Sequence, residues 1–238
     1  MSGVIWHDLE CGGYRRDLVL WRELAERHPG PVLDLGAGTG RVALELARAG
    51  HEVIALDADQ DLLLELGRRS DGLALRTVCA DARDFTLPAR VGLCLMPMQT
   101  VQLLGGPQGR LAFLNCARRH LLPGGVIAIA ITEGLETFEV RDGDPAPLPD
   151  LVELAGVVYC SQPTAVRQEG RQFVLERRRE TVDPLGDRQV SHDRVALDRV
   201  SVAQLQREGV SLGLRSLPAQ EIPPTYEHVG SQVVMLAV

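Results

Sequence analysis

One aspartate interrupts an apolar segment just before a glycine-rich turn. Asp34 lies within the apolar run 32–35, and the next five residues are Gly36, Ala37, Gly38, Thr39 and Gly40. A buried carboxylate without partners is costly, so Asp34 requires hydrogen-bond donors from the backbone or from a ligand. Glycines at alternate positions permit a tight turn and leave room for a ligand against the backbone. These features predict a nucleoside-binding turn between a strand and a helix.

The spacing of the glycines distinguishes two classes of nucleoside site. A dinucleotide-binding turn has its third glycine three positions after the second, beside the pyrophosphate. Here that position holds Arg41, and the third glycine comes one residue earlier. The pattern Asp-x-Gly-x-Gly-x-Gly instead resembles the first motif of class I S-adenosylmethionine-dependent methyltransferases. The resemblance implies that the cofactor is S-adenosylmethionine and that it is bound by Asp34, Gly36, Ala37, Gly38 and Gly40.

Two more acidic residues follow strand-like segments in the order that this family shows. The resemblance implies that Asp57, next to Ala58, accepts hydrogen bonds from the ribose hydroxyls, a role that suits a carboxylate. It also implies that Asp81 accepts from the adenine amino group, with the backbone of Ala82 at the ring nitrogen. Three motifs are therefore predicted to surround one nucleoside.

Other predicted loops supply candidates for the rest of the cofactor site. Met96 ends the fourth predicted strand and Met98 lies in the loop after it. Both are expected to flank the methionine part of the cofactor, with core packing as the alternative. Tyr14 precedes the first predicted helix, where related small-molecule methyltransferases fold an aromatic lid. We expect Tyr14 to contact the cofactor, with Arg15 or Arg22 as counter-ion, although simple packing is the common role of such an aromatic.

Three side chains are candidate acid–base groups for the methyl acceptor. Glu133 follows the fifth predicted strand, and Tyr226 and His228 join the last two strands at the same sheet edge. Histidine titrates near neutrality, which suits proton transfer. A solvated role is the alternative for His228, and an acceptor with a free electron pair needs no base.

Strands and helices alternate between residues 31 and about 133, which predicts a parallel sheet covered on both faces. The strands are predicted at 32–35, 51–56, 73–79, 90–96 and 126–131. A helix is expected over 15–27, and Thr39 is expected to cap the helix that stops at Gly50.

The pattern changes after the fifth strand. Strand-like stretches at 152–160, 171–182 and 188–200 predict an inserted antiparallel meander. The charge cluster 176–180 is interpreted as a solvated sheet face, because acids interleave with the arginines. Beyond it, Ser201 and Gln204 form a capping box for a helix, and the segments 214–222 and 231–238 resemble the family's terminal hairpin.

The predicted fold class is therefore α/β. It is a doubly wound, mostly parallel seven-stranded sheet, the Rossmann-like methyltransferase fold, with an antiparallel β-meander inserted after strand five. Residues 1–30 are assigned to a helical lid, 31–135 with 201–238 to the cofactor-binding domain, and 136–200 to a cap over the substrate.

Composition excludes several classes of protein. The chain has 238 residues, 45% of them hydrophobic, which suits one large domain or one domain with an insertion. Its five cysteines show no paired spacing, so we expect no disulfide framework and no metal site, and a cytoplasmic location. A net charge of −7 argues against nucleic-acid binding, and neither a membrane span nor a secretory signal is apparent. All 25 basic residues are Arg, which excludes a Schiff-base lysine.

These observations predict in-line methyl transfer from S-adenosylmethionine to a small organic molecule. The acceptor atom stays open among oxygen, nitrogen, carbon and sulfur. Two alternatives are a nicotinamide-dependent oxidoreductase and a non-catalytic S-adenosylmethionine-binding regulator. An exposed meander edge also allows a homodimer.

Overall fold

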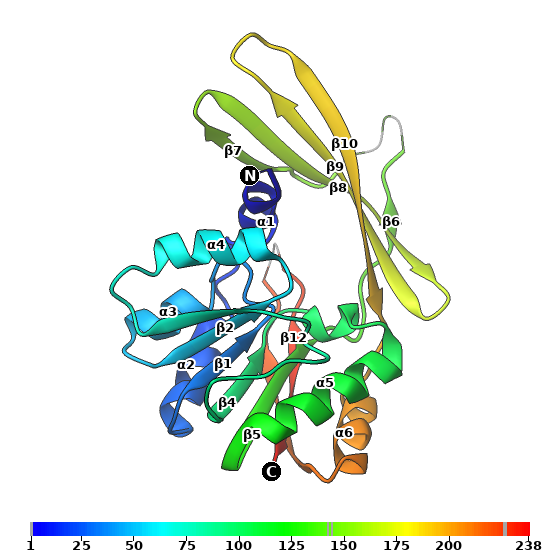
Figure 1. Ribbon diagram of the computed structural model, residues 1–238. Coiled ribbons are helices and arrows are strands. Elements are labelled where there is room, and N and C mark those ends of the chain that lie inside the picture. Colours follow the sequence, from blue (N-terminus) through cyan, green and yellow to red (C-terminus); the bar gives the residue numbers. More distant parts are fainter. Residues whose placement is uncertain (1, 142, 144, 226–227) are drawn as a thin grey trace. The chain divides into compact units, whose positions relative to one another are not determined.

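The chain forms two compact units, which are described separately (Figure 1). The sheet unit comprises Tyr14–Glu133 and Val200–Val238, and the meander unit comprises Met1–Gly13 and Gly134–Arg199. The segment 1–30 is thus divided between the units at residue 13. The computed structural model describes residues 2–141, 143, 145–225 and 228–238.

The sheet unit contains a seven-stranded sheet with the order β11-β12-β5-β4-β1-β2-β3. Six strands run in the same direction, and β12 runs antiparallel to its neighbours β5 and β11, as the terminal-hairpin resemblance implies. The strands are β1 (Val32–Leu35), β2 (Val53–Asp57), β3 (Leu75–Cys79), β4 (Val91–Met96), β5 (Leu121–Ile131), β11 (Arg215–Ile222) and β12 (Ser231–Ala237). The predicted doubly wound α/β fold is confirmed.

Helices cover both faces of this sheet (Figure 1). They are α2 (Leu18–Arg27), α3 (Ala43–Arg48), α4 (Gln60–Arg69), η1 (Thr100–Leu103), α5 (Gly106–His120) and α6 (Val202–Ser211). One core cluster joins α2, α3 and α4 to the sheet, and a second joins α5 and α6 to the opposite face. Alternate residues of each central strand enter opposite clusters, as the two-residue period of a strand requires. Within the described residues, no helix has the length and apolar character to cross a membrane.

Two local predictions are wrong. Thr39 does not cap α3, because the helix begins at Ala43 and Val42 occupies the N-cap position without a side-chain hydrogen bond. The glycine turn continues for two residues beyond Gly40 before the helix starts. The fifth strand begins at Leu121, which pairs with Val91 ahead of a register shift, so it is longer than expected.

The Ser201 half of the capping box predicted for α6 is confirmed, whereas the Gln204 side chain donates to Glu208 Oε1 at 3.1 Å. Ser201 Oγ accepts a hydrogen bond from the Gln204 amide at 3.2 Å, and Glu133 Oε1 accepts from the Val202 amide at 2.6 Å. Both acceptors satisfy amide groups of the first helical turn, which have no partner within the helix.

Replacing Ser201 with Ala is expected to lower the free energy of unfolding by about 1 kcal/mol. The midpoint of urea denaturation measures the change. Ser211→Ala, at the other end of α6, is the control because Ser211 bonds only the exposed turn there. Equal midpoints for Ser201→Ala and the unaltered protein would contradict the capping role.

The meander unit contains a five-stranded antiparallel sheet with the order β10-β9-β8-β6, and β7 also pairs with β8. The elements are α1 (Ser2–Cys11), β6 (Phe138–Glu139), β7 (Asp150–Leu154), β8 (Val157–Glu169), β9 (Gln172–Val182) and β10 (Arg188–Asp198). The single strand expected at 152–160 is wrong. Gly156, at φ +80°, and Ala155, at φ +51°, turn the chain between β7 and β8.

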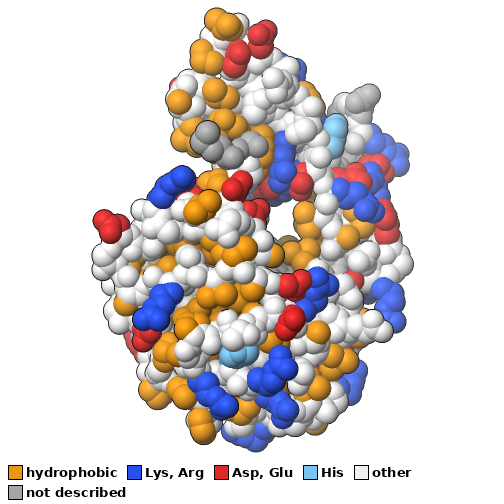
Figure 2. Space-filling model, in the orientation of Figure 1, with side chains coloured by type: hydrophobic (Ala, Val, Ile, Leu, Met, Phe, Trp, Pro, Cys, Tyr) orange, Lys and Arg blue, Asp and Glu red, His pale blue; other side chains and the backbone are white. Residues whose placement is uncertain are grey.

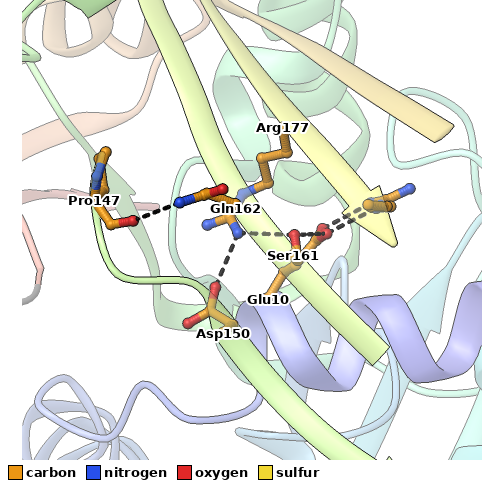
Figure 3. A network of polar contacts seen from close by, with 7 residues as sticks. Glu10, Pro147, Asp150, Ser161, Gln162 and Arg177 are labelled. Carbon is orange, nitrogen blue, oxygen red and sulfur yellow. Dashed lines mark hydrogen bonds and ion pairs between the residues drawn. The ribbon is translucent and has the colours of Figure 1, made fainter. Parts of the chain in front are cut away.

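Helix α1 was not predicted, and side chains of this unit bind it to β8 and β9 (Figure 3). Glu10 accepts two hydrogen bonds from Arg179 and one from Ser161, each at 2.7 Å. Arg179 also lies over the Trp6 ring, with its guanidinium carbon 5.4 Å from the centroid. Burial raises the pKa of Glu10, but hydrogen bonds from Arg179 and Ser161 outweigh this effect and lower it overall. These long-range contacts explain why local periodicity did not reveal α1.

The charge cluster 176–180 is a set of ion pairs. Arg177 forms an ion pair with Asp150, with a nitrogen–oxygen distance of 2.9 Å, and Arg178 forms one with Glu180 at 2.8 Å. On the visible face of this unit, acidic and basic side chains are interleaved (Figure 2). These pairs favour the interpretation as a charged sheet surface over that of an anion-binding patch.

Candidate functional site

The strand order reverses between β4 and β1, because β1 lies between β4 and β2. In open α/β sheets, ligands bind beyond the carboxyl ends of the strands at such a reversal. The glycine turn follows β1 here, and η1 follows β4. Topology therefore places the predicted nucleoside turn at the position where this fold has its ligand site.

The end of β2 holds the glycine turn in place. The amides of Gly36 and Ala37 both donate to the carbonyl of Leu56, at 2.9 and 3.0 Å. The Gly38 amide donates to Asp57 Oδ2 at 2.8 Å, and the Asp59 amide donates to Asp57 Oδ1 at 2.9 Å. Asp57 is partly exposed and each carboxylate oxygen can accept a further hydrogen bond, so it is able to bind ribose hydroxyls.

Two glycines of the turn are required by close approach as well as by backbone angle. Gly36 has φ +70°, and a Cβ there would lie 2.6 Å from Thr100 Cγ2 of η1. Gly40 has φ +97°, and a Cβ there would overlap Leu66 of α4. Gly36 is exposed at the turn's surface, whereas Gly38 and Gly40 are buried. Gly40 therefore serves packing against α4, and Gly36 makes room for Thr100 while its backbone stays exposed.

Two buried side chains near the turn have unsatisfied polar atoms. Among the described residues, the buried side-chain atoms without a hydrogen-bond partner are Tyr14 Oη and both oxygens of Asp34. Tyr14 is 8% exposed and Asp34 is 1% exposed. Such groups normally have partners, and each unmet one costs about 1–3 kcal/mol. Their joint location marks the carboxyl end of β1 as a place for a polar ligand.

The environment of these two groups changes their ionisation. Burial raises the pKa of Asp34 to about 7, and the charges of Asp17 and Asp57 add to this increase. The Arg41 charge and the nearby Ala43 amide oppose it, although neither Asp34 oxygen has a hydrogen-bond partner. Burial also raises the pKa of Tyr14, and Asp17 adds to this increase while Arg41 opposes it. A cation brought by a ligand is thus the group that this environment favours.

The cation next to Tyr14 is Arg41, whose guanidinium carbon lies 5.3 Å from the Tyr14 ring centroid. Arg41 also donates to the Tyr14 carbonyl at 2.8 Å. The expectation of Arg15 or Arg22 as counter-ion receives no support, because Arg15 is exposed and Arg22 pairs with Glu45 at 3.4 Å. Sequence reasoning treated Arg41 only as a missing glycine. The available signal in the sequence was that Arg41 places a charge in a turn that was predicted to be buried, where a charge needs a partner.

In the loop after β3, the adenine-binding candidate Asp81 already accepts hydrogen bonds from within the chain. Asp81 accepts from the Arg83 side chain at 2.6 Å and from the Arg83 amide at 2.8 Å. The Arg83 hydrogen bonds hold the pKa of Asp81 below its usual range. Asp81 remains exposed, as does Ala58 after β2, and Ala82 is half-buried. The prediction that Asp81 and Ala82 bind adenine is untested by these contacts.

The two methionines at the end of β4 occupy different environments. Met96 is fully buried in the core cluster on the α5 face, with apolar neighbours. This burial favours the core-packing alternative for the Met96 side chain, and its contact with the cofactor stays a prediction. Met98 is partly exposed in the turn toward η1, at φ +55°. It keeps its place as a cofactor candidate.

The acid–base candidates lie in different settings. Glu133 is exposed and accepts from the Val202 amide, so its carboxylate already serves the start of α6. The exposed His228 has its ring centroid 4.9 Å from that of Tyr14. The Thr225 amide donates to the His228 carbonyl and the His228 amide donates to Thr225 Oγ1, each at 2.9 Å. Tyr226 lies outside the described residues. Among the candidates that the structure describes, His228 lies beside Tyr14.

Another link at this edge escaped sequence reasoning. Gln102 of η1 is fully buried, accepts from the Thr132 amide at 2.9 Å and donates to the Thr132 carbonyl at 3.2 Å. The paired contacts join the carboxyl ends of β4 and β5. A glutamine in an apolar helix pattern was the available signal.

Comparison with known proteins identifies the central part of the chain. Residues 32–125 match the model of a family described as a methyltransferase domain. The cypemycin N-terminal methyltransferase of a Streptomyces species is 34% identical over 113 residues, which are 48% of this chain and 46% of that protein. A ribosomal RNA small subunit methyltransferase of Arabidopsis thaliana is 37% identical over 68 residues, 19% of its length. The matched regions thus span less than half the length of these curated relatives.

Solved structures share the fold over nearly the whole chain. The sugar N-methyltransferase KedS8 of a Streptoalloteichus species matches 100% of this chain and 92% of its own, with a TM-score of 0.78 and 14% identity. CalS10, an amino pentose methyltransferase of Micromonospora echinaspora solved with SAM bound, matches 97% of this chain and 96% of its own, with a TM-score of 0.71 and 19% identity. These matches confirm the predicted Rossmann-like methyltransferase fold.

Proposed function

We propose that this chain, in which residues 32–125 form a methyltransferase domain, is an enzyme that transfers a methyl group from S-adenosylmethionine to a small organic molecule. The observation that carries the proposal is the set of unsatisfied atoms on Tyr14 and Asp34. They lie beside a glycine turn that Asp57 anchors at the strand-order reversal. This arrangement provides hydrogen-bond acceptors and negative charge for a polar, cationic nucleoside.

The residues at this sheet edge each bind a different part of the cofactor. Asp57 accepts from the ribose hydroxyls while its other contacts hold the turn, and the exposed Gly36 lets the nucleoside approach the backbone. Asp81 and Ala82 bind the adenine. Asp34, Tyr14 and Met98 serve the methionine end, where the bound cofactor supplies a methyl carbon made electrophilic by its sulfonium. Alignment and exclusion of water are then the main tasks of the protein.

The acceptor atom in this proposal is an amine nitrogen. Support comes from similar proteins, whose printed names describe a sugar N-methyltransferase, an amino pentose methyltransferase and an N-terminal methyltransferase. An amine attacks through its free electron pair, so it must be neutral and must lose a proton after transfer. His228 is the group proposed to take up that proton, because it lies beside Tyr14 and an imidazole nitrogen can accept a proton.

Further parts of the proposal concern the meander unit and the assembly. The meander sheet closes over the acceptor, and two copies pair through β10. The support is that β10 is an edge strand, with Val190 48% exposed and Val195 36% exposed. Sedimentation velocity distinguishes monomer from dimer, and a Val190→Lys variant is expected to be monomeric. The five cysteines show no paired spacing in the sequence, which supports a cytoplasmic location, and the net charge of −7 argues against nucleic acid as a partner.

Binding and transfer assays test the proposal. Calorimetry is expected to show binding of S-adenosylhomocysteine and none of NAD⁺. Mass spectrometry is then expected to show the gain of one methyl group on an amino sugar or a peptide amine, but not on the matched hydroxyl compound. Retention of NAD⁺ alone would favour an oxidoreductase. Tight S-adenosylhomocysteine binding without transfer to any amine would favour a non-catalytic regulator.

A further inference from the structure

Asp17 and Arg41 form a buried ion pair between the start of α2 and the end of the glycine turn. Arg41 Nη1 lies 2.5 Å from Asp17 Oδ1, and Nη2 lies 2.7 Å from Oδ2. The Arg41 side chain is 8% exposed and the Asp17 side chain is 1% exposed. Two parallel contacts between a guanidinium and a carboxylate fix orientation as well as distance. The residues are 24 positions apart, so the pair joins two separate segments of the sheet unit.

The surrounding contacts extend this link to Tyr14. Trp21 Nε1 donates to Asp17 Oδ2 at 2.7 Å, which holds the carboxylate from the α2 side. Arg41 donates to the Tyr14 carbonyl at 2.8 Å and lies over the Tyr14 ring. His228 also contacts Tyr14, and the centroids of the two rings lie 4.9 Å apart. Arg41 therefore sets the backbone and the ring of Tyr14 with one side chain.

Stability alone does not account for this pair. Desolvation of two charges commonly cancels their attraction, so neutral replacement of a whole buried pair is often tolerated. Removal of one partner is costly because it leaves the other charge buried alone. The chain holds a second buried pair, in which Arg110 of α5 contacts Glu208 of α6 at 2.7 and 2.9 Å. Arg110 is 1% exposed, and this pair offers a matched reference away from the glycine turn.

We propose that the Asp17–Arg41 pair positions Tyr14 and the glycine turn for the cofactor. Asp17 and Arg41 are positioning residues in this proposal, because they act through Tyr14 and the turn rather than on the methyl group. The inference rests on the proposed S-adenosylmethionine site. It goes beyond that site because it assigns a role to Arg41, which stands where a dinucleotide-binding turn needs glycine, and to its partner Asp17.

The test compares charge-free versions of the two buried pairs. Asp17→Asn with Arg41→Met removes both charges and keeps an oxygen for Trp21, and Arg110→Met with Glu208→Gln is the matched control. Thermal denaturation reports stability, and calorimetry with S-adenosylhomocysteine reports affinity. We expect both double variants to fold. The Asp17/Arg41 variant should bind at least about 10-fold more weakly, and the control should stay within about 2-fold.

A Tyr14→Ala variant distinguishes the positioning of Tyr14 from a general loss of rigidity in the fold. Tyr14→Ala alone should weaken S-adenosylhomocysteine binding, and adding the Asp17/Arg41 changes should then cause a smaller loss than they cause when Tyr14 is present, because part of the effect of the pair passes through Tyr14. If the double variant does not fold, Arg41→Lys keeps a charge for Asp17 but loses the two-point contact, and it should bind several-fold more weakly.

The outcomes distinguish this inference from the proposed function. If the unaltered protein does not bind S-adenosylhomocysteine, the proposed function fails. If it binds, and a folded Asp17/Arg41 variant or the Arg41→Lys variant binds equally well, the pair is only structural. Full additivity with Tyr14→Ala would likewise overturn the inference.

Discussion

Replacing Asp57 with Ala is expected to weaken S-adenosylhomocysteine binding by about 100-fold or more. The carboxylate accepts hydrogen bonds from the amides of Gly38 and Asp59 and, in the proposed complex, from the ribose hydroxyls. A hydrogen bond to a charged group contributes about 1.5–3 kcal/mol, so the loss of two toward the ribose corresponds to roughly 10²–10⁴ in affinity. Isothermal titration calorimetry measures the change directly.

Asp59 provides the control for this experiment. Its Oδ1 accepts from the amides of Asp61 and Leu62, so it caps α4 only two residues from Asp57. Asp59→Ala is expected to cost about 1 kcal/mol of stability and to change affinity only slightly. If both variants bind S-adenosylhomocysteine as the unaltered protein does, the ribose is not held by Asp57.

Much of the sheet unit could be predicted because its signals are local. The apolar run before Asp34 and the glycines after it are readable from the sequence. Burial of both sheet faces makes the central strands continuous apolar runs, and turn glycines mark their ends. These same local features placed the glycine turn and Asp57 next to each other.

The parts that escaped prediction depend on contacts between distant segments. Helix α1 is bound through Glu10 to Arg179, and the two residues are 169 positions apart. Arg41 reads as a solvent-exposed charge until its partner Asp17 is known. Met96 and Met98 are two residues apart, yet the strand end puts one in the core and leaves the other at the turn. Spacing alone does not carry this information.

Asp34→Asn is expected to act in opposite directions on stability and on cofactor binding. Burial raises the pKa of Asp34 from 3.8 to about 7, so the folded protein holds a proton that the unfolded chain releases. The stability that this proton contributes is complete below about pH 4 and is lost as the pH rises through about 7. Because one pKa unit is about 1.4 kcal/mol, ionised Asp34 costs the free protein up to about 4 kcal/mol near pH 8.

Asparagine has nearly the same shape and never ionises, so the variant avoids this cost. Urea denaturation without ligand is expected to show the variant more stable by about 2–4 kcal/mol near pH 8 and nearly equal near pH 4. Asp71→Asn, at an exposed position after α4, should show no such pH dependence. A stability difference that is the same at both pH values would contradict the raised pKa.

Ligand binding should respond in the opposite sense. The ammonium group of S-adenosylhomocysteine favours ionised Asp34, so the affinity of the unaltered protein is expected to rise between about pH 6 and pH 8. Asp34→Asn should bind about 10–100-fold more weakly near pH 8, with little change across that range. Calorimetry at both pH values decides the matter. A variant that gains stability and also keeps full affinity would show that the buried carboxylate serves no cofactor, and the unsatisfied oxygens would then need another explanation.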